Sequence, residues 1–277
     1  MIYFLTALYY EAKDIIFHYN MKKSMESTRF QVFKGKNEIL IISGTGYIKS
    51  VAAVTYLLNC FGYNENDIFI NIGICGSTRY ELEKGKIILC NKLIDNCSKK
   101  SFYPDMLFKH PFNEGTLESF AQVVEQDKLE KIEGDIVDQE GAFVYQAASI
   151  FAKPHNIHII KIVSDILNPQ SVTPEKIERL FVDSMQSIYI WLEKIVKINF
   201  YSEDIITKEE YNVLKLLSEN IKLTSSMKME LNKLSTQYKI RNGHVIELLK
   251  EYTKFQCKSK NEGKKIFGQV KNRLMEL

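Results

Sequence analysis

The chain contains five short apolar segments, and each ends in a carboxylate or in a glycine turn. Their β-branched residues favour strands, and helix-like periodicity fills the sequence between them. The strand segments are 2–8, 39–42, 68–71, 135–137 and 158–163, and the helical segments are 11–20, 48–61, 140–152 and 174–198. This alternation predicts a layered α/β domain built on a mostly parallel sheet.

Three acidic residues follow these strands: Glu11, Glu140 and Asp165. In open α/β sheets, ligands bind outside the carboxyl ends of the strands, where residues from separate segments meet. We therefore predict that the three carboxylates share one active site. Glycine turns at 43–46 and 71–77 follow two other strands, although each turn by itself indicates only a tight connection after a strand.

The stretch 91–115 is polar, contains two prolines and shows no clear period. These features predict a long surface loop with short strands. Such loops often cover a site, but plain connection is the simpler interpretation.

The composition changes near residue 200. A chain of 277 residues, 45% of them hydrophobic, has enough apolar material for one medium α/β domain with an appendage. Residues 1–203 carry 22 Lys/Arg and 25 Asp/Glu, whereas 204–277 carry 15 and 9, so the C-terminal part is basic. Its helical patterns cover 207–219, 225–238, 242–256 and 261–275. We expect an α/β catalytic domain over 1–200 and a small all-α, basic domain over 201–277.

The basic C-terminal domain has two interpretations. Its lysines form a solvated face on helices that pack against the rest of the protein or a second subunit, or they bind nucleic acid. The first interpretation is favoured, because acids are interspersed among the lysines and few aromatic residues accompany them.

Cysteine usage and hydropathy indicate the compartment. The five cysteines form no CxxC pair and leave one over, which argues against a disulfide framework or a zinc knuckle. The first residues lack a basic leader, and no apolar segment approaches the roughly 20 residues of a membrane span. We expect a cytoplasmic protein with no membrane partner, no cofactor and no metal.

Taken in chain order, five motifs resemble the nucleoside phosphorylase and nucleosidase superfamily, most closely its methylthioadenosine/S-adenosylhomocysteine nucleosidase branch. The motifs are Ala-Leu-Tyr-Tyr-Glu at 7–11, Ser-Gly-Thr-Gly at 43–46, Asn-Ile-Gly-Ile-Cys-Gly at 71–76, Val-Asp-Gln-Glu-Gly-Ala at 137–142 and Val-Ser-Asp-Ile at 163–166. The resemblance covers roughly residues 1–199. It implies a three-layer α/β/α fold around a central mixed, twisted sheet, and a homodimer.

The resemblance also implies hydrolysis of the N-glycosidic bond between a purine and a ribose, through an oxocarbenium-like transition state. Asp165 would give a proton to the purine N7, with Ser164 helping to hold its carboxyl group. Glu140 would accept hydrogen bonds from the 2′ and 3′ ribose hydroxyls. Glu11 would orient and deprotonate the attacking water.

Other substrate contacts are expected from the same motifs, at Leu8, Thr45, Gly46, Gly73, Ile74, Gln139 and Ser164. For the aromatic ring that stacks on the base, the sequence offers Phe120. Three positions depart from the family's pattern: Gln139 stands in place of a methionine, Ile74 in place of a serine or threonine, and Lys161 in place of an arginine. The departures leave the reaction type standing, and they leave the base and the 5′ substituent open.

Two other functions remain as alternatives. A purine nucleoside phosphorylase of this superfamily typically surrounds phosphate with arginines, but the first loop here offers Tyr9, Tyr10 and Glu11 and no arginine. A carboxylate at that point repels phosphate, which favours water as the nucleophile. The non-catalytic alternative is a nucleoside-sensing or nucleic-acid-associated protein that keeps the pocket and uses the C-terminal domain as its effector.

Overall fold

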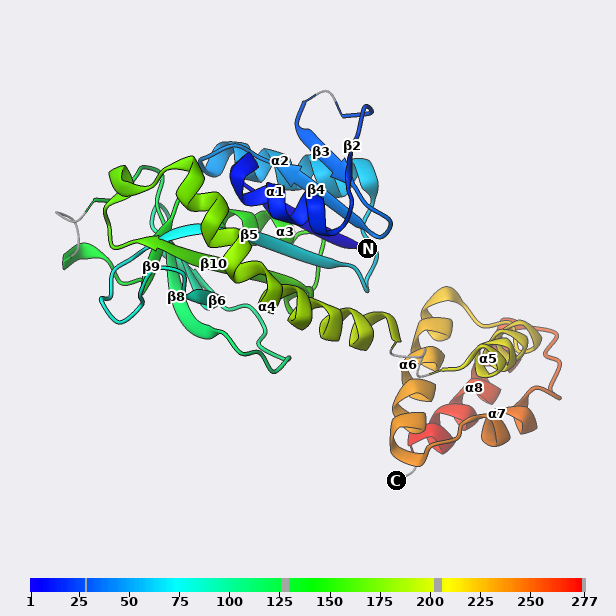
Figure 1. The fold of residues 1–277 in the computed structure, drawn as a ribbon. Helices are drawn as coiled ribbons and strands as arrows, with labels where there is room; N and C mark the ends of the chain where they lie inside the picture. Colours follow the sequence, from blue (N-terminus) through cyan, green and yellow to red (C-terminus); the bar gives the residue numbers. More distant parts are fainter. Residues whose placement is uncertain (28, 126–129, 202–205, 276–277) are drawn as a thin grey trace. The chain divides into compact units, whose positions relative to one another are not determined.

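The computed structural model describes residues 1–27, 29–125, 130–201 and 206–275. The chain divides into two compact units, Met1–Ile195 (unit 1) and Val196–Leu277 (unit 2). The division falls inside helix α4, Pro174–Tyr201, five residues before the limit of the predicted catalytic domain. Figure 1 shows that the strands all belong to unit 1 and that the described part of unit 2 is helical.

Unit 1 is built on one sheet of ten strands in the described residues. The strands are β1 Ile2–Thr6, β2 Lys22–Lys23, β3 Gln31–Lys34, β4 Glu38–Ile42, β5 Ile68–Ser77, β6 Ile87–Asp95, β7 Lys100–Phe102, β8 Asn113–Ser119, β9 Ile136–Asp138 and β10 Ile157–Asp165. All five predicted strand segments are confirmed. The strands after which the sequence places its acids and glycine turns thus belong to a single sheet.

The pairing of the strands explains why their ends meet. β4, β1, β5 and β10 are parallel neighbours in this order. β10 also pairs antiparallel with β6, so that β5, β9, β8, β6 and β10 close into a ring. The parallel and antiparallel pairs make the sheet mixed, as the resemblance implies. The carboxyl ends of β1, β4, β5 and β10 therefore lie at one edge.

Helices cover both faces of the sheet (Figure 1). Every residue of β1 is buried, as expected for a strand between two helical layers. Tyr3 and Leu5 join the apolar core under α2, Tyr47–Phe61, and α3, Gly141–Ala148.

On the other face, α1, Tyr9–His18, packs against α4. The Tyr189 hydroxyl donates to Asp14 at 2.6 Å, and its ring stacks on His18. The predicted three-layer α/β/α arrangement is confirmed.

The expectation of a long surface loop with short strands over 91–115 is right only for its middle part. β7 is a strand of three residues and 103–112 contain neither helix nor strand, but both ends of the stretch belong to longer strands, β6 and β8. β6 and β8 have nine and seven residues and belong to the strand ring. The hydrophobic pattern does not reveal these strands, because some of their polar side chains are buried and hydrogen-bonded within the protein. Glu118, 2% exposed, accepts hydrogen bonds from the amides of Glu133 at 2.8 Å and Gly134 at 3.2 Å. The side chain of Asn96 donates to it as well, at 2.6 Å.

Besides the end of α4, unit 2 contains four helices in its described residues, α5 Lys208–Asn220, α6 Ser225–Asn242, α7 Ile246–Tyr252 and α8 Lys260–Met275. The predicted all-α extension is confirmed, with α7 shorter than expected. Thr207 and Thr224 begin α5 and α6, each accepting the N–H of the third helical residue. Its apolar core includes residues from all four helices, among them Leu214, Leu217, Leu231, Leu249, Phe267 and Val270.

One glycine fixes the packing of unit 2. A Cβ at Gly263 of α8 would lie 1.8 Å from the carbonyl oxygen of Ile221. No other residue fits there without moving the backbone, so α8 and the turn after α5 approach each other only because this position lacks a side chain. In the part of the chain that the structure describes, no helix has both the length and the apolar character needed to cross a bilayer.

Candidate active site

A cavity of about 370 Å³ opens at the carboxyl ends of β1, β5 and β10. Glu11, Glu140 and Asp165 all line it, although they come from segments far apart in the sequence. Five of the predicted contact residues line the same cavity: Leu8, Thr45, Ile74, Gln139 and Ser164. The structure therefore brings the three acids together in one site.

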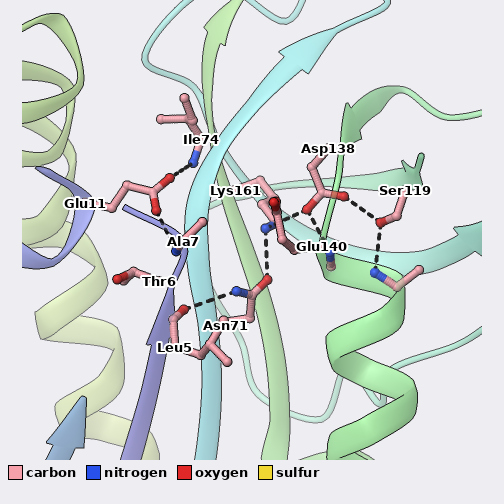
Figure 2. A network of polar contacts seen from close by, with 12 residues as sticks. Leu5, Thr6, Ala7, Glu11, Asn71, Ile74, Ser119, Asp138, Glu140 and Lys161 are labelled. Atoms are coloured by element: carbon pink, nitrogen blue, oxygen red, sulfur yellow. Dashed lines mark hydrogen bonds and ion pairs between the residues drawn. The ribbon is translucent and has the colours of Figure 1, made fainter. Parts of the chain in front are cut away.

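Glu11 lies in the first turn of α1 and is 2% exposed. One carboxylate oxygen accepts the N–H groups of Ala7 at 2.9 Å and Leu8 at 2.8 Å. The other accepts the N–H of Ile74 at 2.9 Å, and Figure 2 shows the contacts with Ala7 and Ile74. The side chain thus ties the start of α1 to strand β5. Burial raises its pKa, while these N–H groups and Lys161 oppose the rise.

Gly73, another predicted contact residue, does not line the cavity. A Cβ there would lie 3.0 Å from the Glu11 carboxylate. The glycine therefore acts one step behind the site, because it leaves room for Glu11 to approach β5.

Glu140 immediately precedes α3 and is 8% exposed. Its Oε1 accepts the N–H of Gly46 at 2.6 Å. Gly46 has φ +95°, a conformation that side-chain-bearing residues rarely adopt, and so the turn after β4 requires a glycine to present this N–H. Gly46 positions the acid rather than lining the cavity, whereas Thr45 beside it lines the cavity wall.

Asp165 reaches the cavity through an irregularity at the end of β10. The pairing of β10 with β5 shifts between Val163 and Asp165, so Ser164 is an extra residue in the strand. Successive side chains of a regular strand point to opposite faces, but a bulge re-aims them. Both Ser164 and Asp165 consequently line the cavity.

The Asp165 carboxyl group is held on both sides. Ser164 Oγ lies 2.5 Å from Oδ1 and 3.1 Å from the carbonyl oxygen of Cys75. The N–H of Asn168 donates to Oδ2 at 2.7 Å. These contacts fix the orientation of the carboxyl group toward the cavity.

A buried cation lies behind the acids. The ammonium of Lys161 contacts Asp138 at 2.8 Å and donates to Asn71 Oδ1 at 2.9 Å (Figure 2). The side chains of Lys161 and Asp138 are each 2% exposed. Burial by itself lowers the pKa of an ammonium, but Asp138 and Glu140 outweigh it, so the pKa of Lys161 is raised and the residue stays charged.

Asp138 links this cation to the start of α3. Its carboxylate accepts the N–H of Gly141 at 2.8 Å and the hydroxyl of Ser119 at 2.5 Å. Ser119 Oγ in turn accepts the N–H of Ala142 at 2.9 Å. Because Glu140 lies between Asp138 and Gly141 in the chain, this network sets the position of Glu140.

The electrostatic balance at Glu140 brings its titration close to neutrality. Burial and the neighbouring charge of Asp138 raise its pKa, while Lys161 and the Gly46 N–H lower it. The resulting pKa is about 7. A small change in the surroundings therefore decides whether this carboxyl group is ionised.

The rest of the cavity wall is apolar. It is formed mainly by Ala7, Val123, Val124, Val137, Leu167, Pro169, Val172 and Ile177. No aromatic ring, lysine, arginine or histidine is among the described residues that line it. Sequence reasoning missed much of this wall, since Val123, Val124, Leu167 and Val172 come from irregular segments without a motif.

The stacking role predicted for Phe120 is not supported by its position. Phe120 packs in a small cluster with Val124, Val137 and Leu167, and it lines a neighbouring cavity instead of this one. Val123 and Val124 separate the two cavities, because they line both. The wall of the site is thus aliphatic where the resemblance led us to expect an aromatic ring.

Asp138 and Asn71 were also missed as site residues, and Lys161 was noted only as a departure from the pattern. The sequence does hold a signal for Lys161, which is a lone charge within the apolar strand segment 158–163. In the described ranges there is no group of three His, Cys, Asp or Glu side chains placed to hold a metal ion.

Comparison with solved structures finds this fold in nucleosidases. The methylthioadenosine/S-adenosylhomocysteine nucleosidase of S. pneumoniae aligns with a TM-score of 0.59 at 20% identity, over 69% of this chain and 97% of that one. The S-adenosylhomocysteine nucleosidase of Streptococcus pyogenes gives 0.60 at 19%, over 70% and 96%. Futalosine hydrolase of Helicobacter pylori gives 0.55 at 18%, over 71% and 97%.

The chain has the nucleosidase fold. These neighbours belong to the nucleoside phosphorylase and nucleosidase superfamily, so the resemblance seen in the five motifs is confirmed at the level of the fold. No family model matches the sequence, and no curated protein matches it. Since identities near 20% carry the fold alone, the function has to be argued from the site.

Proposed function

We propose that the protein hydrolyses the N-glycosidic bond of a purine nucleoside and releases the free base and a ribose derivative. The observation that carries this proposal is the convergence of Glu11, Glu140 and Asp165 on one cavity with an apolar wall. Cleavage of this bond needs a proton donor for the leaving base, a carboxylate near the sugar and an activated nucleophile. The three acids match these three needs.

The charges around the cavity favour water over phosphate. Asp138 lines the cavity together with the three acids, and the cation Lys161 is buried behind them, in contact with Asp138. A phosphate ion would enter a site surrounded by carboxylates, at a large electrostatic cost. Neutral water pays no such cost.

Asp165 is the proton donor in this proposal. Its carboxyl group is oriented by Ser164 and by the N–H of Asn168, and a general acid must be held within reach of the atom that it protonates. Transfer of its proton to the purine N7 lets the base leave as a neutral molecule. Val124 and Leu167 also line the cavity, so the acid shares the site with apolar side chains.

Glu140 binds the ribose. Its Oε1 is held by Gly46, and we assign Oε2 to the sugar hydroxyls. A carboxylate with a pKa of about 7 is readily ionised as positive charge develops on the sugar. Its hydrogen bonds to the hydroxyls then strengthen in the transition state, which is how such contacts accelerate a reaction.

Glu11 positions the nucleophile. Its three N–H contacts fix the carboxylate, and each carboxylate oxygen can accept two hydrogen bonds. The oxygen that receives the Ile74 N–H therefore retains a lone pair for water. Burial raises the pKa of Glu11 and so makes it a stronger base than an exposed glutamate.

The apolar wall favours a substrate with an apolar 5′ group, as in methylthioadenosine or the thioether of S-adenosylhomocysteine. Val172 and Ile177, which follow Asp165 in the chain, and Leu8, which precedes α1, supply apolar surface to this wall. The neighbours named above are nucleosidases for these two compounds and a futalosine hydrolase. We propose the same class of 5′-modified purine nucleosides for this chain.

The test is release of free base from methylthioadenosine, S-adenosylhomocysteine, futalosine, adenosine and inosine, with and without phosphate. Asp165→Asn serves as the catalytic control, and Asp183→Asn, at an exposed position of the same unit, as its matched partner. We expect phosphate-independent release that is lost in Asp165→Asn and kept in Asp183→Asn. Release only with phosphate would establish a phosphorylase instead, and silence across the panel would contradict the proposal.

A further inference from the structure

Two connecting segments of unit 2, the turn after α5 and the segment between α7 and α8, lie side by side although they are distant in the sequence. The side chain of Asn220 donates to the Thr253 carbonyl at 2.7 Å, and the N–H of Cys257 donates to the Asn220 carbonyl at 2.9 Å. Lys222 reaches the carbonyl of Lys258 at 2.9 Å. The turn after α5 is thereby joined to the segment between α7 and α8.

This junction concentrates positive charge on the surface. We call it the basic end and define it by exposed residues of the two connections and of the start of α8: Lys222, Lys254, Phe255, Lys258, Lys260 and Lys264. Residues 250–265 contain six lysines and only two glutamates, so the local balance is more positive than the unit as a whole. The concentration arises from the fold, because Lys222 is 32 residues before Lys254.

Among the described residues, no carboxylate of unit 2 forms an ion pair with a lysine of the basic end. The ion pairs of unit 2 among described residues join Lys239 to Glu210 and Lys271 to Glu230. The nearby Glu262 points its carboxylate at the N–H of Lys258, at 2.7 Å. It therefore caps the start of α8 rather than pairing with a lysine side chain.

An aromatic ring is exposed among these charges. Phe255 lies between Lys254 and Lys258 in the chain and is 45% exposed, and its ring centroid is 6.1 Å from that of Tyr252. A large apolar ring on a connecting segment gains little by facing water. Exposed aromatic rings flanked by cations are the surfaces on which proteins stack the bases of single strands.

We propose that the basic end of unit 2 binds single-stranded nucleic acid. The lysines contact phosphates along the strand, and a base stacks on Phe255. An anionic membrane surface would also attract the lysines, but surface helices that insert into a membrane present a broad apolar face, whereas this end offers a single ring on the segment between α7 and α8. None of the residues of the basic end lines the cavity of unit 1, and the proposal does not depend on the nucleosidase activity.

The experiment uses the full chain and a fluorescein-labelled poly-uridine strand of about 20 nucleotides, with binding followed by anisotropy at several salt concentrations. The substituted protein carries Lys254→Gln, Lys258→Gln and Lys260→Gln. We expect its affinity to fall at least tenfold, and the slope of log affinity against log salt to fall by about 2, from roughly 0.7 for each lost phosphate contact.

A matched control carries Lys208→Gln, Lys215→Gln and Lys233→Gln, three exposed lysines further along α5 and α6. It has the same net charge as the first variant, and we expect its affinity to stay within about twofold of the unsubstituted chain. Phe255→Leu should weaken binding by about tenfold with an unchanged salt slope, because it removes stacking and no charge.

Equal losses in the two lysine variants would overturn the proposal, since they would show attraction by net charge alone. No binding at 50 mM salt would overturn it as well. Vesicles of anionic lipid form the last arm: retention on vesicles without binding to the oligonucleotide would assign the basic end to a membrane and contradict the inference.

Discussion

The two units of this protein treat charge in opposite ways. Unit 1 buries three carboxylates and an ammonium beside its cavity: Glu11, Asp138, Glu140 and Lys161. Unit 2 keeps nearly all of its described charged side chains exposed, and its core is apolar. Its buried acid, Glu210, pairs with Lys239 at 2.7 Å.

The pKa values of the buried acids Glu210 in unit 2 and Glu11 and Glu140 in unit 1 shift in opposite directions in the two units. Glu210 is partly desolvated, but the hydrogen bonds of Lys239 and Thr207 outweigh this, and its pKa is lowered. For Glu11 and Glu140, burial prevails and the pKa is raised. In unit 2, an ion pair stabilises the charged form of the acid. In unit 1, burial favours the protonated form of two acids, and pKa values perturbed in this way are common among catalytic groups.

The largest expected effect is on catalysis. Asp165→Asn should lower kcat/KM for the best nucleoside by a thousandfold or more, about 4 kcal/mol of barrier, because the amide cannot protonate the leaving base. Initial rates of base release measure it. A similar loss in Asp183→Asn would mean that the effect is general, and normal rates in Asp165→Asn would remove the acid from the mechanism.

The next effect is on the stability of unit 1. Lys161→Met leaves Asp138 and Glu140 without their cation and should lower the free energy of unfolding by about 3–5 kcal/mol. Lys84→Met, at an exposed site of unit 1, should change it by less than about 0.5 kcal/mol.

Urea unfolding can be followed selectively for unit 1. The chain has a single tryptophan, and this residue, Trp191, is 2% exposed and packs against His158 of β10. Its fluorescence therefore reports unit 1 alone. Equal stabilities of Lys161→Met and the unsubstituted chain would contradict the view that the buried cation compensates the acids.

The stability of unit 1 should also depend on pH through Glu140. Its pKa is about 7 in the folded protein, against an ordinary value of 4.5. Because the folded state binds the proton more tightly, this contribution is fully present below pH 4.5 and is lost as the pH rises through 7. The loss is on the order of 3 kcal/mol at most.

Glu140→Gln removes this titration, so its unfolding free energy should change less between pH 4.5 and 7.5 than that of the unsubstituted chain. Tryptophan-detected urea unfolding at several pH values measures the difference. Parallel pH profiles of the two proteins would show that Glu140 is not held with a raised pKa.

The smallest effect belongs to unit 2. Gly263→Ala forces a Cβ against the Ile221 carbonyl and should destabilise the unit by about 1–3 kcal/mol. Gly268→Ala, in the same helix, meets nothing within 4 Å and should stabilise it by up to about 1 kcal/mol. Far-ultraviolet circular dichroism during urea unfolding measures the change, and equal stabilities of the two variants would contradict the packing role of Gly263.

The sequence predicted most of the fold where hydrophobic pattern and burial agree. Mainly apolar strands such as β1 and β10, and helices with an amphipathic pattern such as α5, stand out by periodicity alone. β6 and β8 were not predicted because they contain buried polar side chains. Glu118, for example, is hydrogen-bonded to Glu133 and Asn96, which are distant from it in the sequence. No local pattern reports such a partner.

The site was predictable to the extent that it follows strand ends. Glu11, Glu140 and Asp165 were singled out because each stands at the end of a strand or shortly after it, and the structure gathers them at one cavity. Val123 and Val172 were missed because irregular segments carry them to the cavity. Phe120 was chosen because it is aromatic, but in the structure it packs against the apolar cluster of Val124, Val137 and Leu167.

The origin of the oxygen in the sugar product tests the central claim most directly. The reaction is run with methylthioadenosine in phosphate-free ¹⁸O-labelled water, and the released sugar is reduced at once with borohydride to prevent exchange at its anomeric carbon. We predict release of adenine and one ¹⁸O atom in the reduced sugar, as water activated by Glu11 requires. Release of base only after phosphate is added, with a phosphorylated and unlabelled sugar, would contradict the account.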